Sequence, residues 1–205
     1  MIEFVAMTKL QDAGAAAVPV KELLLEIAKM FECAAQSTYP AAIEEAARII
    51  GDAFAQGHKL LAFGNGGSAS DAQHFCGEFV VQFQKKRRAL PAIALSCDGA
   101  VMTACANDLG YAEIFARQIQ ALGSAGDVAF GFSTSGKSSN VLRGLDAARE
   151  LGLATILLTG PRTNPAYDLV ISAPGHDAAS IQELHLAGYH AICELVEARF
   201  FGQGQ

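Results

Sequence analysis

The sequence predicts one α/β domain built on an open parallel sheet. The chain has 205 residues, of which 51% are hydrophobic, and this suits a single domain with a sizeable core. From Gly57 onward, five short apolar runs recur, and each is closed by Gly, Ser, Asn or Pro. Stretches with helical spacing separate most of these runs. Apolar strands that alternate with helices are typical of a parallel sheet covered on both faces.

Two amphipathic helices are predicted before the first strand. Over Lys21–Cys33 and Pro40–Ala55, apolar residues recur at the intervals of three and four that place them on one helix face. Residues 1–20, "MIEFVAMTKLQDAGAAAVPV", show no such pattern. We expect this lead-in to be loosely ordered, or helical only against a partner, and the domain to span residues 21–202.

The rest of the chain alternates between strands and helices. We expect strands in "KLLAFG", "AIALSC", "DVAFGF", "ATILLTG" and "DLVISAP". Helices are expected over Ser70–Phe83, Ala112–Leu122, Asn140–Leu151 and Ala178–Phe200. Ligands of open α/β sheets bind beyond the carboxyl ends of the strands. The loops "GNGGS" and "STSGKS", which each follow a strand and open a helix, are therefore the predicted binding edge.

Composition excludes several classes of function. A net charge of −6 gives no sign of a protein that binds nucleic acid or a membrane surface, and the basic run Lys85–Arg88 is best explained as a solvated patch. Five scattered cysteines without a C-x-x-C pair argue against a disulfide framework or a cysteine zinc ribbon. The sequence shows neither a signal-peptide pattern nor a long apolar run, so we expect a cytoplasmic protein.

The octapeptide "GFSTSGKS", residues 131–138, formally matches the phosphate loop of nucleoside triphosphatases. Its interior is rich in hydroxyls instead of glycines, and the strands that follow end in "LLTG" and "VISAP", without the carboxylate that would hold Mg²⁺. Ser133, Thr134, Ser135 and Ser138 place hydroxyl groups at a helix N-terminus, where backbone N–H groups favour an anion. We predict an anion-binding loop and not a triphosphatase; helix capping alone is the alternative for these serines.

Two helices carry candidate acid/base or metal-binding residues. His74 and Glu78 are four residues apart and project from one helix face, where they can share a metal ion or form an acid/base pair, or lie together by chance. The segment "IQELHLAGYHAICELVE" places His190 seven residues after Glu183 and eight after Gln182. Periodicity favours Glu183 as the partner of His190. The alternative is the solvent-exposed face of an amphipathic helix with incidental histidines.

Four segments, in matching order, carry a family resemblance: "GNGGSASDAQHFCGEF", "ANDLGYAEIFARQIQALGSAGDV", "STSGKSSNVL" and "IQELHLAGYHAICELVE". Through them the chain resembles the phosphoheptose isomerases, or sedoheptulose-7-phosphate isomerases, of the sugar isomerase (SIS) domain superfamily. The resemblance covers roughly Leu23 to Gly202. It implies a single SIS domain with a five-stranded parallel sheet flanked by helices in a Rossmann-like three-layer arrangement. It also implies a homotetramer with active sites at subunit interfaces, in which the N-terminal helices serve oligomerisation.

The same resemblance assigns residues. It implies one Zn²⁺ per subunit on His74, Glu78, Gln182 and His190, and so replaces the periodicity preference for Glu183 by Gln182. It implies Glu78 as the catalytic base and His190 as the partner acid/base. The residues that it implies for contacts with the sugar phosphate are Asn65, Gly66, Gly67, Ser68, Asp71, Glu78, Asn107, Asp108, Ser133, Thr134, Ser135, Ser138, Asp177 and Gln182.

The implied activity is aldose–ketose isomerisation. Sedoheptulose 7-phosphate would become D-glycero-D-manno-heptose 7-phosphate by proton transfer between C1 and C2 through an enediol, as the first step of heptose synthesis for lipopolysaccharide or other surface glycans. Two alternatives remain open. One is a non-catalytic relative that binds the bacterial replication initiator and lacks the acid/base residues. The other is a SIS isomerase or sensor for another phosphosugar.

The chain departs from the family pattern at two places. Family members often carry a hydroxyl and a basic residue just before the "IQE" segment, where this chain has Ala178, Ala179 and Ser180. Gly77, beside Glu78, is an acidic residue in some relatives. Both differences bear on contacts with the sugar and not on the metal or phosphate elements.

Overall fold

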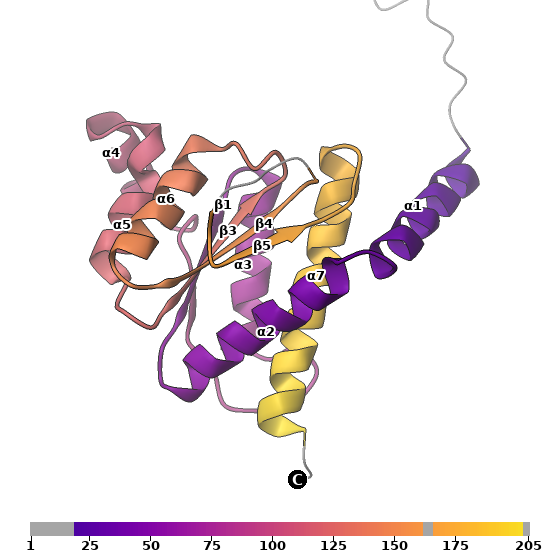
Figure 1. Cartoon of the computed structure of the whole chain (residues 1–205). Coiled ribbons are helices and arrows are strands. Elements are labelled where there is room, and N and C mark those ends of the chain that lie inside the picture. The colour runs from indigo at the N-terminus through magenta and orange to yellow at the C-terminus, as the bar shows by residue number, and fades with distance from the viewer. Residues whose placement is uncertain (1–18, 162–165, 203–205) are drawn as a thin grey trace, which may run out of the picture.

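The computed structural model describes residues 19–161 and 166–202, and it confirms the five-stranded parallel sheet. The strand order is β2-β1-β3-β4-β5, and every neighbouring pair is parallel (Figure 1). Residues 1–18, which make up most of the predicted lead-in, lie outside the described residues. The strands are β1 (Leu60–Gly64), β2 (Ala92–Ala94), β3 (Val128–Ser133), β4 (Ala154–Thr159) and β5 (Leu169–Ser172).

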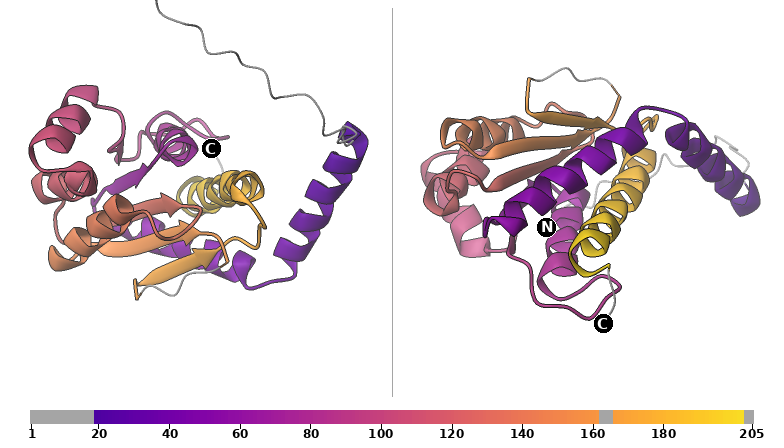
Figure 2. Two further views of the ribbon diagram at one scale, coloured as in Figure 1. Left: turned by 90° about the horizontal axis from the view of Figure 1, so that it is seen from above. Right: turned by 60° about the horizontal axis from the view of Figure 1, so that its bottom comes forward.

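Helices cover both faces of the sheet, as the alternating pattern predicts (Figure 2). On one face lie α2 (Tyr39–Ala55), α3 (Gly67–Val80) and α7 (Ala178–Phe201). On the other lie α5 (Ile114–Leu122) and α6 (Ser139–Glu150). The result is a three-layer domain with a separate apolar core on each side of the sheet.

The central strands are apolar on both faces because both faces are covered. Leu60 and Ala62 of β1 belong to the core beneath α2, α3 and α7. Leu61 and Phe63, which alternate with them, belong to the core beneath α5 and α6. A strand that buries every side chain shows a continuous apolar run instead of an alternating one, which is the signal that "KLLAFG" carries.

One helix, α4 (Gly99–Asp108), escaped prediction. Cys105 is the only buried residue of α4. A helix that packs so little surface on the core does not need the apolar periodicity by which a helix is predicted from sequence. Its start is fixed locally instead: the Asp98 side chain accepts hydrogen bonds from the N–H groups of Ala100 and Val101. A 3₁₀ turn, η1 (Tyr111–Glu113), follows before α5 begins.

The predicted helix over Ser70–Phe83 is wrong at both ends. Helix α3 begins earlier, at Gly67, and ends at Val80. It stops because the Arg87 guanidinium, returning from the following loop, donates hydrogen bonds to the carbonyls of Glu78 and Phe79. Similarly, β2 retains only three of the six residues in "AIALSC".

Helix α1 (Val20–Ala35) extends away from the body of the domain (Figure 1). Its exposed apolar side chains are Val20, Leu23, Leu24, Leu25 and Phe31. A groove of about 430 Å³, lined mainly by apolar residues, runs between α1, α2 and α7. None of the described helices is both long and apolar enough to span a membrane.

A buried histidine on α7 predicts a pH dependence of stability. His185 is fully buried beside Phe132, and burial lowers its pKa to about 4, an effect that the Thr159 backbone only partly offsets. The unfolded chain protonates this imidazole near pH 6.5. The contribution of the neutral His185 side chain to the free energy of unfolding is therefore fully present above pH 6.5, and it is lost as the pH falls toward 4. Between pH 7 and pH 5 the loss from this group is about 2 kcal/mol.

Urea unfolding of the wild type and of His185→Leu at both pH values measures this contribution. The wild type should lose about 2 kcal/mol more free energy of unfolding than the variant on acidification. Equal losses in the two proteins would contradict the assignment.

Candidate active site

The strand order brings two distant loops together. Because β1 lies between β2 and β3, the chain leaves β1 for α3 on one face and leaves β3 for α6 on the other. The two loops are joined by side chains: Asn65 and Asn140 exchange amide hydrogen bonds of 2.8 and 2.7 Å. Tyr111 also donates to the Asn65 side-chain oxygen at 3.0 Å. Asn140 and Tyr111 were not predicted as site residues, although both lie inside the segments that carry the family resemblance.

The loop after β3 has the features of an anion site. Ser133 and Ser138 hold its two ends together, with their Oγ atoms 2.9 Å apart. Ser138 is the N-cap residue of α6 but makes no side-chain cap hydrogen bond, so it does not occupy the N–H groups of Ser139 and Asn140. The Val141 N–H donates to Asn140 Oδ1 at 3.0 Å. Ser135 and Lys137 are exposed. A cavity of about 380 Å³ adjoins the loop and is bordered by Thr134, Ser135 and Lys137.

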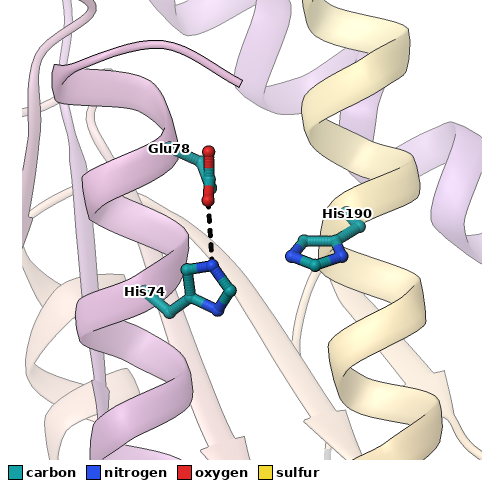
Figure 3. A group of neighbouring side chains, drawn as sticks. All are labelled: His74, Glu78 and His190. Atoms are coloured by element: carbon teal, nitrogen blue, oxygen red, sulfur yellow. Dashed lines mark hydrogen bonds and ion pairs between the residues drawn. The ribbon is translucent and has the colours of Figure 1, made fainter. Parts of the chain in front are cut away.

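A second group of polar residues lies between α3 and α7 (Figure 3). His74 and Glu78 come from α3 and His190 from α7, and one potential ligand atom of each lies within 4.8 Å of the others. His74 Nε2 and Glu78 Oε1 are 2.8 Å apart. His190 Nε2 is buried and has no hydrogen-bond partner among the described residues, and a buried polar atom in this state is costly unless it binds a ligand. Two imidazoles and a carboxylate in this arrangement fit a metal ion such as Zn²⁺.

Tyr189 orients the His74 imidazole. The Tyr189 hydroxyl lies 2.7 Å from His74 Nδ1, so the other ring nitrogen is left facing Glu78 and His190. Tyr189 is fully buried, and burial raises the pKa of its phenol, which therefore stays neutral. Tyr189 was not predicted as a site residue from the sequence. The available signal was a tyrosine inside an apolar helix, because a buried phenol usually needs a hydrogen-bond partner.

Gln182 and Glu183 have different surroundings. A Cβ at Gly67 would lie 2.5 Å from Gln182 Nε2, so the Gln182 amide lies against the first turn of α3. Glu183 does not belong to the group formed by His74, Glu78 and His190 in the described part of the chain. The described group around His190 is thus completed by His74 and Glu78, and the periodicity preference for Glu183 stays a prediction.

Burial perturbs two ionisable groups around this centre. Burial raises the pKa of the Asp71 carboxyl to about 6, against the opposing influence of His74. Burial and the neighbouring His74 lower the pKa of His190, while Glu78 partly offsets this. Perturbed groups of this kind concentrate at functional sites.

The remaining predicted residues occupy several positions along the same loops. Gly66 adopts a φ of +57° at the start of α3, and Ser68 is buried in its first turn. Asn107 and Asp108, at the end of α4, are exposed, and the Asn107 amide donates to the Asp108 carboxylate at 2.7 Å. These two are linked to each other and not, through any recorded hydrogen bond, to the histidine group.

Asp177 begins α7 and borders the 380 Å³ cavity. Its Oδ1 accepts a hydrogen bond from the Ser180 N–H at 2.8 Å, and its own backbone N–H donates to Ser180 Oγ at 3.1 Å; these two bonds form a capping box. Ala178, Ala179 and Ser180, where the chain differs from the family pattern, thus form a regular first turn of α7, in which Ser180 is the third helical residue.

Comparison with known proteins agrees with this architecture. Residues 26–160 match the SIS domain family. A phosphoheptose isomerase of Citrifermentans bemidjiense is 47% identical over 175 residues, which cover 84% of this chain and 91% of that protein. The chain belongs to the phosphoheptose isomerase family. Two solved phosphoheptose isomerases share its fold. The structure from Francisella tularensis has 33% identity, a TM-score of 0.82 and coverage of 86% and 95% of the two chains. The structure from Neisseria gonorrhoeae has 34% identity and a TM-score of 0.80, and the match covers 87% of this chain and 97% of that one.

The contact between Tyr189 and His74 predicts a change in metal affinity. Tyr189→Phe removes the hydroxyl that orients the imidazole, and loss of such an outer contact typically weakens metal binding about 10- to 100-fold. Zn²⁺ affinity is measured by competition with a chromogenic chelator. Tyr39→Phe is the matched control, because its buried hydroxyl donates to the Leu184 carbonyl and not to a histidine. Equal affinities of the Tyr189→Phe and Tyr39→Phe variants would contradict this role.

Proposed function

We propose that the chain interconverts sedoheptulose 7-phosphate and D-glycero-D-manno-heptose 7-phosphate. The observation that carries the proposal is the His74–Glu78–His190 group, present in a chain with 47% identity to a phosphoheptose isomerase. Aldose–ketose isomerisation needs a base, a second proton carrier and stabilisation of an oxyanion, and this group offers the side chains for all three.

We propose a single Zn²⁺ per subunit, held by His74, Glu78, Gln182 and His190. Two features support it: the buried, unpartnered Nε2 of His190, and the contact with Tyr189 that leaves Nε2 of His74 for a ligand. Mixed nitrogen and oxygen donors suit this ion. When bound, zinc supplies Lewis-acid polarisation of the substrate's carbonyl oxygen.

The chain's own residues would move the protons. The Glu78 carboxylate takes a proton from C1 of the ketose and returns it to C2 of the resulting enediol. The His190 imidazole carries the accompanying proton between the oxygens on C1 and C2. Positioned acid/base groups of this kind typically contribute factors of about 10² to 10⁴ in rate.

The loop after β3 would hold the other end of the substrate. Ser133, Thr134, Ser135 and Ser138, together with the N–H groups at the start of α6, bind the phosphate. Phosphate binding then orients C1 and C2 against the acid/base residues. Further contacts with the sugar phosphate are proposed for Asn65, Gly66, Gly67, Ser68, Asp71, Asn107, Asp108 and Asp177.

The competing functions have less support. A non-catalytic relative would lack the acid/base residues, whereas this chain has both Glu78 and His190. A triphosphatase would need a carboxylate on a neighbouring strand, whereas β4 and β5 end at Thr159 and Ser172. Within this proposal the reaction is cytoplasmic and begins heptose synthesis for lipopolysaccharide or another surface glycan.

We further propose a homotetramer with active sites at subunit interfaces. The support comes from α1, whose apolar side chains are exposed in the isolated chain, and from the apolar groove between α1, α2 and α7. Exposed apolar surfaces of this kind mark interaction sites.

Conversion of sedoheptulose 7-phosphate by zinc-loaded protein tests the activity. The wild type should convert the sugar, and Glu78→Gln should lose about 10²-fold or more in kcat because the amide cannot accept the C1 proton. Glu183→Gln is the matched control, since this residue lies outside the histidine group. The proposal fails if the wild type is inactive while an authentic isomerase works in parallel. Phosphate release from ATP that depends on Lys137 would support the triphosphatase instead.

Assembly is tested on α1. Leu24, which is 60% exposed in the isolated chain, should be buried in the tetramer, so Leu24→Lys should shift sedimentation toward smaller species. Leu151→Lys, at the end of α6, is the control and should sediment as the wild type. Unchanged sedimentation of Leu24→Lys would exclude this face as the interface.

A further inference from the structure

A buried ion pair links the two helices that carry the histidine group. Arg87 lies in the loop after α3, and Glu197 lies near the end of α7, seven residues beyond His190. Their side chains are 0% and 2% exposed, and Arg87 Nε donates to Glu197 Oε1 at 2.7 Å. A buried pair often adds little stability compared with an apolar pair of similar volume, so its presence calls for another explanation.

Glu197 organises the loop that follows α3. Besides Arg87, its carboxylate accepts hydrogen bonds from the backbone N–H groups of Phe83, Gln84 and Lys85, at 2.9, 3.0 and 3.0 Å. Burial raises the pKa of Glu197, but these donors outweigh it and hold the pKa below its ordinary value. The ionised carboxylate therefore fixes the backbone of three successive residues.

The first of these residues contacts the site. The Phe83 ring packs against the His190 imidazole, with centroids 5.3 Å apart and an angle of 39° between the planes. His74 approaches the same imidazole edge-on, with centroids 5.1 Å apart. The position of Phe83, set through its N–H by Glu197, thus limits how the His190 ring can turn.

Arg87 acts on the other helix. Its guanidinium donates to the carbonyl oxygens of Glu78, at 2.5 Å, and Phe79, at 2.8 Å. These carbonyls belong to the last turn of α3 and lack partners within the helix. Arg87 therefore fixes the backbone that carries the Glu78 carboxylate.

We propose that Arg87, Glu197 and Phe83 form a positioning unit for the isomerisation: Arg87 and Glu197 set the spacing of the Glu78 and His190 side chains, and Phe83 transmits it to the imidazole. None of the three is among the residues proposed to contact the sugar phosphate. This inference rests on the proposed function, and it adds a set of residues that act through the acid/base pair.

Two variants separate positioning from folding. Phe83→Leu removes the aromatic contact but keeps the backbone N–H that Glu197 binds. The double variant Arg87→Met with Glu197→Leu replaces the buried pair by apolar side chains, but it also removes the acceptor of three backbone N–H groups and is expected to lower the unfolding midpoint. We expect kcat to fall about 10- to 100-fold in both, with little change in KM for sedoheptulose 7-phosphate. The unfolding midpoint of Phe83→Leu, which keeps every one of these hydrogen bonds, should stay close to that of the wild type.

Asp52→Asn is the matched control. Asp52 pairs with Arg199 at 2.6 Å and links α7 to α2, and within the described part of the chain no hydrogen bond or ion pair joins it to α3 or to residues 81–88. The kcat of the Asp52→Asn variant should equal that of the wild type. A kcat in Phe83→Leu equal to that of Asp52→Asn would overturn the proposal. Full activity in the double variant would also overturn the proposal, since the ion pair would then serve the structure alone.

Zn²⁺ affinity gives a readout independent of the substrate. Misplaced His190 and Glu78 side chains should weaken Zn²⁺ binding by Phe83→Leu and by the double variant about 10-fold, while Asp52→Asn should bind as the wild type. If the wild type fails to convert the sugar, the proposed function fails, and the affinities alone then decide the positioning role. Unchanged affinity in both variants would overturn it.

Discussion

The parallel alignment of five strands is the constraint on which the site depends. Since every strand runs in the same direction, all carboxyl ends meet at one edge of the sheet, and β1 and β3 are immediate neighbours there. The register pairs Gly64 with Phe132, so the loops that follow leave from the same level. The paired amides of Asn65 and Asn140 then join the start of α3 to the phosphate loop.

The packing of α3 against α7 adds the chemistry. This interface is mostly apolar, yet it contains polar groups at two levels: His74 with Tyr189, and Arg87 with Glu197. Buried polar groups persist when their partners are in place, and here each partner comes from the other helix or its adjoining loop. The same hydrogen bonds that make burial tolerable also fix the orientation of side chains suited to proton transfer and metal binding.

Local signals predicted the elements and failed where the deciding contact was distant. The five strands were found from apolar runs, but α4 was missed because it packs on the core through little more than Cys105. The end of α3 was overextended because Arg87, outside the helix, closes it. Periodicity favoured Glu183, whereas α7 turns Gln182 toward Gly67.

The sequence by itself determined the alternation of strands and helices, the hydroxyl-rich loop after β3, and the pairing of His74 with Glu78, all of which follow from contacts within a few residues. The family resemblance implied His190 as the partner of this pair, and the tertiary structure brings it there. Only the tertiary structure decided that Tyr189 orients His74 and that Glu197 arranges the loop carrying Phe83. The chain separations involved exceed one hundred residues. At such distances the neighbours of a side chain depend on how helices pack across a sheet, and no local periodicity records that packing.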